Sequence, residues 1–179
     1  MGNRHNRLAS LCVIMALVLF LSNTSCSNTP APELVGGTPG SVFINPKSQA
    51  VEPASQIKVS IEVVPAGWGI SAAEVQVSFD PKRLEALSVQ AGDALGPKPI
   101  TGVLKIDNDL GTIVYALARL GETTAPGVRG VLANIEFRGK SGATDTAKIE
   151  LAKVGLSNEN FAEITGVKYD GAIIVFLGR

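Results

Sequence analysis

Residues 56–63 read QIKVSIEV, and this short stretch decides the fold class. Ile57, Val59, Ile61 and Val63 alternate with polar residues, so in an extended chain all four apolar side chains lie on one face. A period of two is typical of a β-strand that has one buried face and one solvated face. The segment therefore predicts a strand in a sheet that covers a core on one side only.

The same alternation returns along the chain after this stretch. It predicts further strands at residues 74–79, 134–138 and 148–151, and less regular strands at 42–45, 84–90, 112–120 and 172–177. The last run is apolar on both faces, which predicts a strand covered on both sides. No segment keeps a helical apolar period for more than about two turns. Eight or nine short strands in residues 41–179 predict one all-β domain, a two-sheet antiparallel sandwich.

Two turns between these strands carry their own signals. Asp80-Pro81 follows an apolar alternation, and proline ends a strand because it fixes φ and has no N–H group. The Asp80 carboxylate is expected to accept backbone hydrogen bonds in that turn. Gly111 follows an acidic turn and is expected to supply a positive φ.

The composition excludes several classes of function. Lys and Arg number 16, as do Asp and Glu, so bulk positive charge for nucleic-acid binding is absent. Both cysteines, the one histidine and both methionines lie in the first 26 residues. Without that segment the chain has no histidine or cysteine for a catalytic nucleophile, a zinc site or a disulfide. We therefore expect a protein that is not an enzyme and holds no cofactor. A glycosidase pair of carboxylates is disfavoured because the acidic residues are scattered over outward faces and turns.

The N-terminal 26 residues have the layout of a secretion signal. Arg4 and Arg7 precede an apolar run, residues 8–21, which is short for a membrane span of about 20 residues. Cys26 follows a small residue, as at the end of a bacterial lipobox, and is predicted to be lipidated and to hold the protein on the outer face of the cell membrane. A cleaved signal without lipid is the alternative. Residues 27–40 are rich in Pro and Gly and predict a tether.

Three segments of the predicted sandwich resemble the cohesin modules of bacterial cell-surface assemblies. They are AEVQVSFDPKRL at residues 73–84, GTIVYALAR at 111–119 after the acidic turn 107–109, and GVLANIEFRGKSGATDTAKIELAKVGLSN at 130–158. Asp170-Gly171 before an apolar final strand fits the ending of the family. The resemblance implies a nine-stranded jelly-roll sandwich, an architecture shared with carbohydrate-binding domains. It also implies binding to dockerins, which are calcium-loaded modules of other secreted proteins, often carbohydrate-active enzymes. The calcium belongs to the dockerin, so no metal is expected on this chain.

The outer face of one sheet is the surface that the resemblance assigns to docking. Glu74 and Gln76 alternate with the apolar set of their strand and should lie on that face, with Glu74 as an acceptor of hydrogen bonds. Thr112, Val114 and Ala116 form an exposed, semi-apolar stripe on another strand. The remaining expected contacts are Asp107, Asn108 and Asp109 at an edge, and Arg119, whose positive charge departs from the family's polar or acidic residue.

Three other interpretations stay open or are weaker. A carbohydrate-binding module of the same architecture is the main alternative, and Trp68 in a Gly-rich loop is its candidate for stacking on a sugar. A lone tryptophan more often seals the end of a sandwich, which is the expectation here. Asp107-x-Asp109 lacks the other ligands of a calcium loop and is expected to be a turn. A spacer without a specific ligand is the third interpretation.

Overall fold

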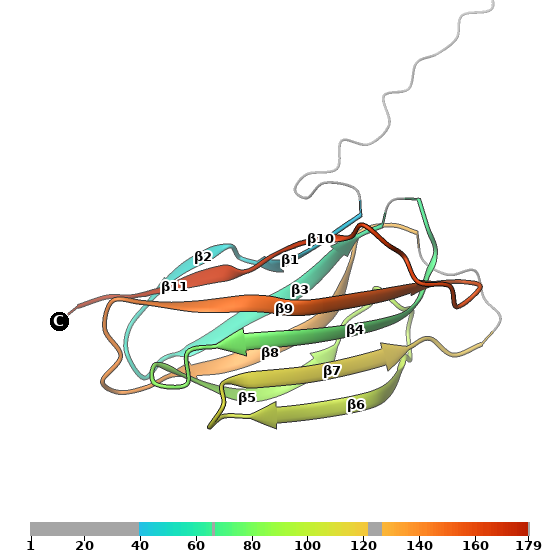
Figure 1. Ribbon diagram of the computed structural model, residues 1–179. Helices are drawn as coiled ribbons and strands as arrows, with labels where there is room; N and C mark the ends of the chain where they lie inside the picture. The colour runs from blue at the N-terminus through green and yellow to red at the C-terminus, as the bar shows by residue number, and fades with distance from the viewer. Residues whose placement is uncertain (1–39, 66, 122–126, 179) are drawn as a thin grey trace, which may run out of the picture. The chain divides into compact units, whose positions relative to one another are not determined.

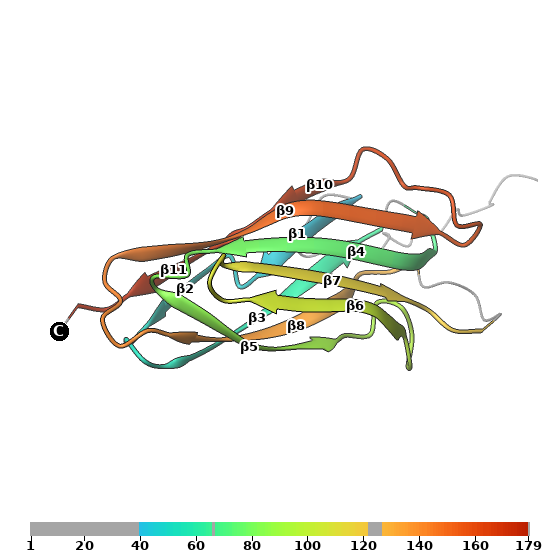
Figure 2. The same ribbon diagram turned by 60° about the horizontal axis from the view of Figure 1, so that its bottom comes forward.

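The computed structural model describes residues 40–65, 67–121 and 127–178, and this part of the chain forms eleven strands and no helix (Figure 1). Sheet A has the order β10-β1-β3-β8-β5 and contains β1 (Ser41–Asn45), β3 (Gln56–Val64), β5 (Leu84–Ala91), β8 (Gly130–Gly139) and β10 (Lys168–Asp170). Sheet B has the order β2-β11-β9-β4-β7-β6 and contains β2 (Ser48–Val51), β4 (Ile70–Phe79), β6 (Ile100–Asp107), β7 (Thr112–Ala118), β9 (Thr146–Asn158) and β11 (Ala172–Phe176). The two sheets form the two layers of the described domain (Figure 2). The predicted all-β sandwich is confirmed.

The core lies between the inner faces of the two sheets. Ile57, Val59, Ile61 and Val63 are at most 3% exposed, so the alternation of residues 56–63 is confirmed as the buried face of β3. The rings of Phe79 in sheet B and Phe137 in sheet A meet edge to face with their centroids 5.2 Å apart. This geometry suits the aromatic quadrupoles and joins the two sheets at the centre of the sandwich.

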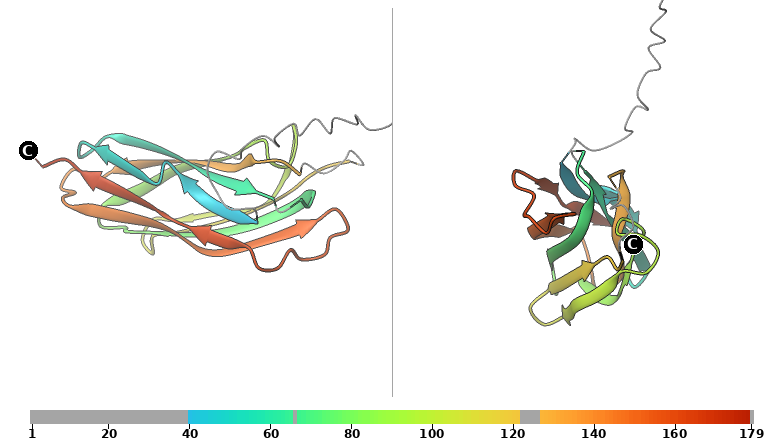
Figure 3. Two further views of the ribbon diagram at one scale, coloured as in Figure 1. Left: turned by 90° about the horizontal axis from the view of Figure 1, so that it is seen from above. Right: turned by 90° about the vertical axis from the view of Figure 1, so that its right-hand side faces the viewer.

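Both ends of the described chain pass from one sheet to the other. β1 belongs to sheet A and β2 to sheet B, with Pro46 between them, and β10 and β11 repeat the change of sheet around Gly171. β1 pairs in parallel with β10, and β2 pairs in parallel with β11 (Figure 3, left). The first and last segments of the domain are therefore bonded to each other in both layers.

The structure differs from the sequence expectations in its strand count and at one face. β2, β6 and β10 were not among the eight strands predicted by residue range, and they raise the count to eleven, two more than the nine that the resemblance implies. The sequence did not predict β6 because a register shift between Thr101 and Val103 interrupts the alternation of its apolar residues. The expectation that residues 172–177 are covered on both sides is wrong. Ile173 is 44% exposed because no layer covers the outer face of sheet B at β11.

The turn after β4 is built by Asp80 and Gly111, as predicted. Asp80 Oδ1 accepts a hydrogen bond of 2.9 Å from the Lys82 amide, and Oδ2 pairs with the Arg83 guanidinium. Gly111 has a φ of 67°, in the left-handed region. A Cβ there would overlap the carbonyl oxygen of Phe79 and lie 2.8 Å from Pro81 Cδ. Only glycine fits between the two turns without distortion.

We expect the stability of the domain to depend on pH through Asp80. Burial raises the pKa of this carboxyl, but the hydrogen bonds and charges of Arg83 and Lys82 outweigh it and hold the pKa below its ordinary value of 3.8. A lowered folded-state pKa stabilises the fold above the unfolded pKa, and this stabilisation is lost as the pH falls through the folded pKa. Asp80→Asn should lower the free energy of unfolding at neutral pH by about 1 kcal/mol at most, because water screens the partly exposed pair.

Urea unfolding at neutral and acidic pH measures this dependence. The difference between the two free energies should be smaller in Asp80→Asn than in the unchanged protein. Glu150→Gln is the control, because the exposed Glu150 carboxylate makes no hydrogen bond or ion pair among the described residues. An unchanged difference in Asp80→Asn would contradict the assignment.

Candidate functional site

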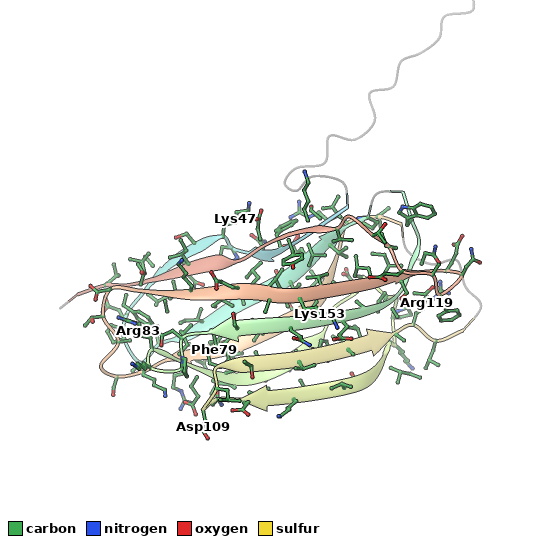
Figure 4. All side chains as sticks on the ribbon, in the orientation of Figure 1. Lys47, Phe79, Arg83, Asp109, Arg119 and Lys153 are labelled. Atoms are coloured by element: carbon green, nitrogen blue, oxygen red, sulfur yellow. The ribbon has the colours of Figure 1, made fainter. Side chains whose placement is uncertain are left out.

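Four neighbouring strands of sheet B, in the order β9-β4-β7-β6, present one broad outer surface, which we call the docking face. Its outward side chains alternate with buried ones on β4 and β7, whereas β6 is exposed along most of its length. They are Lys153, Gly155 and Ser157 on β9; Ala72, Glu74, Gln76 and Ser78 on β4; Thr112, Val114, Ala116 and Ala118 on β7; and Ile100, Val103, Lys105 and Asp107 on β6. In Figure 4, Lys153 lies over the middle of this face, and Asp109 and Arg119 lie near its two ends.

Small side chains occupy the centre of the docking face. Glu74 is paired with Gly155 on β9 and with Ala116 on β7, and Ala116 is paired with Val103 on β6. Ala72 lies one outward position away from Glu74 on β4. These short side chains leave a shallow depression of about 520 Å³, bordered by Glu74, Lys153 and Glu163. A partner can therefore approach the sheet closely at its centre.

Glu74 is the central carboxylate of the docking face. Its Oε1 accepts hydrogen bonds of 3.0 Å from Lys153 Nζ and 3.4 Å from Gln76 Nε2. The Glu74 and Lys153 side chains are 41% and 56% exposed, so water screens the ion pair and its contribution to stability is small. Oε2 has no hydrogen bond within the described parts of the chain. Glu74 can thus accept a hydrogen bond from a partner at little cost to the fold.

The structure brings most of the sequence-predicted residues to this face. Thr112, Val114 and Ala116 line β7 with half-buried side chains, as their alternation indicated. Asp107 lies at the end of β6. Its Oδ1 accepts a hydrogen bond of 3.0 Å from the Leu110 amide, and its Oδ2 lies 3.9 Å from Lys105 Nζ.

Asp109 and Arg119 lie at the margins of the docking face. Asp109 is exposed in the turn between β6 and β7. Arg119 follows the last residue of β7, and its Nη2 donates a hydrogen bond of 3.2 Å to the Gly121 carbonyl. Their placement at opposite ends of β7 makes both residues rim positions.

Asn108 does not belong to the docking face, which corrects the sequence interpretation. Its Oδ1 accepts a hydrogen bond of 2.8 Å from the Ala86 amide, and its Nδ2 donates one of 3.1 Å to the Ala86 carbonyl. The side chain therefore completes the backbone hydrogen bonds of β5 at its register shift, between Ala86 and Ser88. Asn108 fastens the β6–β7 turn of sheet B to sheet A, and its amide is engaged in that link.

Trp68 lies in the loop between β3 and β4, beyond the docking face. Its side chain is 52% exposed, so the expectation that it seals the end of the sandwich is wrong. Sealing would need neighbouring side chains on both faces of the ring, and the Gly-flanked loop holds the ring away from the core.

Sequence reasoning missed the contributions of β6 and of the distal half of β9. Val103 and Ile100 lie on β6, which was not predicted, and Lys153 and Gly155 lie beyond the predicted end of the strand at residue 151. One signal was present for β6. Its apolar residues mirror those of β7 across the acidic turn, which is the pattern of a hairpin.

No metal site or membrane-spanning helix occurs within the described residues. There, no group of three His, Cys, Asp or Glu side chains is close enough to share a metal ion. No helix in residues 40–65, 67–121 or 127–178 is long and apolar enough to cross a bilayer. Cys26, the predicted lipidation site, lies outside these ranges, so its role stays a prediction.

A broad, shallow and half-apolar outer face suits contact with another macromolecule. The model of the cohesin domain family matches residues 40–175, and the chain belongs to the cohesin family. Cohesin domains are non-catalytic binding modules.

Solved structures share this fold. The sixth cohesin of scaffoldin B from Acetivibrio cellulolyticus, solved in complex with a Cel5 dockerin mutant, is 19% identical; the match covers 76% of this chain and 98% of that one, with a TM-score of 0.64. The seventh type I cohesin of ScaB from Pseudobacteroides cellulosolvens is 22% identical over 78% of this chain and 92% of that one, with a TM-score of 0.63. A non-cellulosomal cohesin from the archaeon Archaeoglobus fulgidus is 12% identical over 77% and 91%, with a TM-score of 0.61. No curated protein sequence matches the chain significantly.

Proposed function

We propose that this chain docks a dockerin-bearing secreted protein on the docking face. The observation that carries the proposal is the central carboxylate of Glu74, set among the short side chains of Ala72, Ala116 and Gly155. The structural relative from Acetivibrio cellulolyticus that was solved with a Cel5 dockerin supports the choice of partner.

The arrangement suits a rigid partner surface laid on the sheet. Short side chains at the centre let the backbone of a partner helix come close to the sheet. Glu74 accepts a hydrogen bond from the partner, and the interface shields this bond from water. Val103 and Val114 supply apolar area toward β6. In such interfaces a few central residues carry most of the binding energy, and rim positions such as Asp107, Asp109 and Arg119 contribute less. The partner brings its own calcium.

The proposal includes the place where docking happens. The predicted lipid on Cys26 would hold the domain on the outer face of the cell membrane, with residues 27–40 as the tether. A surface-held receptor of this kind would retain a secreted protein at the cell, and we propose that its cargo takes part in polysaccharide breakdown. The resemblance to cohesins, whose partners are often carbohydrate-active enzymes, supports this last step.

A pull-down with the full chain tests the proposal. The immobilised chain is exposed to the secreted and membrane proteins of its own organism, first with calcium and then with a chelator. Retention of a dockerin-bearing protein only in calcium is the expected result. Failure to retain any such protein in calcium would overturn the proposal. A carbohydrate-binding function predicts retention on glycans instead, although the outward side chains described for the docking face include no aromatic ring for stacking.

Glu74→Ala should weaken dockerin binding by about 1–3 kcal/mol, because a partner donor would lose its charged acceptor in a dry interface. Isothermal titration calorimetry measures the change, with circular dichroism to confirm the fold. Glu136→Ala is the matched control, since Glu136 is a partly exposed carboxylate on β8, in the other sheet. Equal affinities for Glu74→Ala and the unchanged chain would remove Glu74 from the site.

A further inference from the structure

Large apolar side chains gather at one end of sheet B. Strand pairing defines this end, because Ile70 on β4 is paired with Asn158 on β9, and Ala118 on β7 is paired with both Ala72 on β4 and Ile100 on β6. An exposed apolar residue lies at the first position of β6 and within three residues of the corresponding ends of β4, β7 and β9, and one more precedes β8. We call this group the apolar rim; its members and exposures are Phe161 77%, Trp68 52%, Leu120 58%, Ile100 49% and Val128 73%.

Phe161 is held in this exposed position by its loop. Its φ of 58° lies in the left-handed region, which is unusual for an aromatic residue and costs about 1 kcal/mol or more. Asn158 fixes the loop through three hydrogen bonds. Its Oδ1 accepts one of 2.9 Å from the Asn160 amide and one of 3.0 Å from the Ala162 amide. Its backbone carbonyl accepts one of 2.9 Å from the Phe161 amide. A strained backbone that presents a phenyl ring to solvent indicates use of that ring.

The described domain begins at the same end. The Gly40 amide donates a hydrogen bond of 2.7 Å to the Val64 carbonyl, and the Gly40 carbonyl accepts one of 3.0 Å from the Lys168 amide. Val64 ends β3, and Trp68 follows four residues later in the loop to β4. The C-terminal end of the described chain lies at the opposite end of the domain (Figure 1). Cys26 precedes Gly40 by only 14 residues in the sequence.

We propose that the apolar rim rests on the surface of a lipid bilayer, so that the domain stands on its end at the membrane. The inference rests on the membrane anchorage proposed above, and it is independent of the docking partner. Tryptophan and phenylalanine suit the bilayer interface, where an apolar ring meets a wet headgroup region. A membrane anchored through Cys26 would stay within a short chain length of the rim, and its acyl-chain region would accept large apolar side chains, whereas the docking face points sideways from this end.

The charges around the rim predict which lipids suffice. Glu159 and Glu163 flank Phe161 in the sequence, whereas Arg119 precedes Leu120. Both signs are present, so the contact should form on neutral phosphatidylcholine and should not require an anionic lipid.

The single tryptophan of the chain makes the proposal directly measurable. The full chain is reconstituted with vesicles of phosphatidylcholine that carry bromine on the acyl chains, and flotation shows whether it associates. The expected result is strong quenching of Trp68 fluorescence. The control is the double variant Trp68→Phe/Leu177→Trp, which moves the only tryptophan to the opposite end, at a residue that is 44% exposed. Its fluorescence should be quenched several-fold less.

A second variant tests the rim itself. Phe161→Ser/Leu120→Ser should lower the fraction of Trp68 in contact with lipid by about tenfold, because two large apolar side chains leave the contact. Both positions are exposed, so the fold should be kept. Flotation with equal quenching of the two tryptophan positions would overturn the rim contact and leave the anchorage standing. Absence of flotation would overturn both. Quenching that soluble glycans relieve would assign the rim to carbohydrate instead.

Discussion

Replacing Ala116 with arginine should abolish docking while leaving the domain folded. Ala116 lies at the centre of the docking face, between Glu74 and Val103, and its side chain points outward. A long cation there would fill the depression and stand beside Glu74, where it would neutralise the acceptor that we assign to the partner. A central residue of an interface commonly carries 2 kcal/mol or more, so we expect the affinity for a dockerin to fall by more than about 100-fold.

Ala50→Arg is the matched control for Ala116→Arg. Ala50 is exposed on β2, and β2 forms the other edge of the same sheet, separated from β4 by β11 and β9. The same substitution there should leave the affinity within about twofold. Calorimetric titration of both variants with one dockerin decides the matter. If Ala116→Arg bound as tightly as Ala50→Arg, the partner surface would have to lie elsewhere.

Replacing Gly111 with alanine should strongly destabilise the domain. The new Cβ would overlap the Phe79 carbonyl, and the residue would have to keep a φ of 67°. The Phe79 amide also donates a hydrogen bond of 2.8 Å to the Gly111 carbonyl, and this bond would be lost if the turn moved away. Together these effects should lower the free energy of unfolding by about 3–5 kcal/mol, a large part of the stability of an ordinary domain.

Two other glycines separate the causes of this loss. Gly96 has a φ of 87° but nothing within 4 Å of an added Cβ, so Gly96→Ala should cost only about 1 kcal/mol, from the backbone alone. Gly142 has neither a positive φ nor a close neighbour, and Gly142→Ala should be neutral within about 0.5 kcal/mol. Urea unfolding of the three variants gives the ranking. A small effect of Gly111→Ala would mean that the turn relaxes without loss.

The sequence predicts strands well where one face is buried and the other is wet. The buried residues of β7, and those along most of β3 and β4, alternate with more exposed ones, and these strands cover the centre of the core. β6 is exposed along most of its length and carries a register shift, so burial left no regular pattern in its residues. β2 and β10 are short edge strands of four and three residues, and they are held by their neighbours rather than by their own composition.

The candidate site is predicted only in part, for a related reason. Glu74 and the stripe on β7 follow from alternation within single strands. The neighbours that surround Glu74 depend on register between strands that are distant in sequence, such as the pairing of Glu74 with Gly155. Asn108 was misplaced because its exposure to solvent was inferred from a turn, whereas tertiary structure turns its amide toward Ala86.

The parallel pairing of the first and last strands has a mechanical consequence. A pull on the N-terminal end of the domain draws β1 along its own axis, between β3 on one side and β10 on the other. All of the hydrogen bonds between β1 and these two strands then carry the load together, in shear, instead of breaking one after another. β2 repeats the arrangement beside β11 in the second sheet. Under the anchorage and docking that we propose, the first strand would thus resist extraction until many hydrogen bonds fail at once.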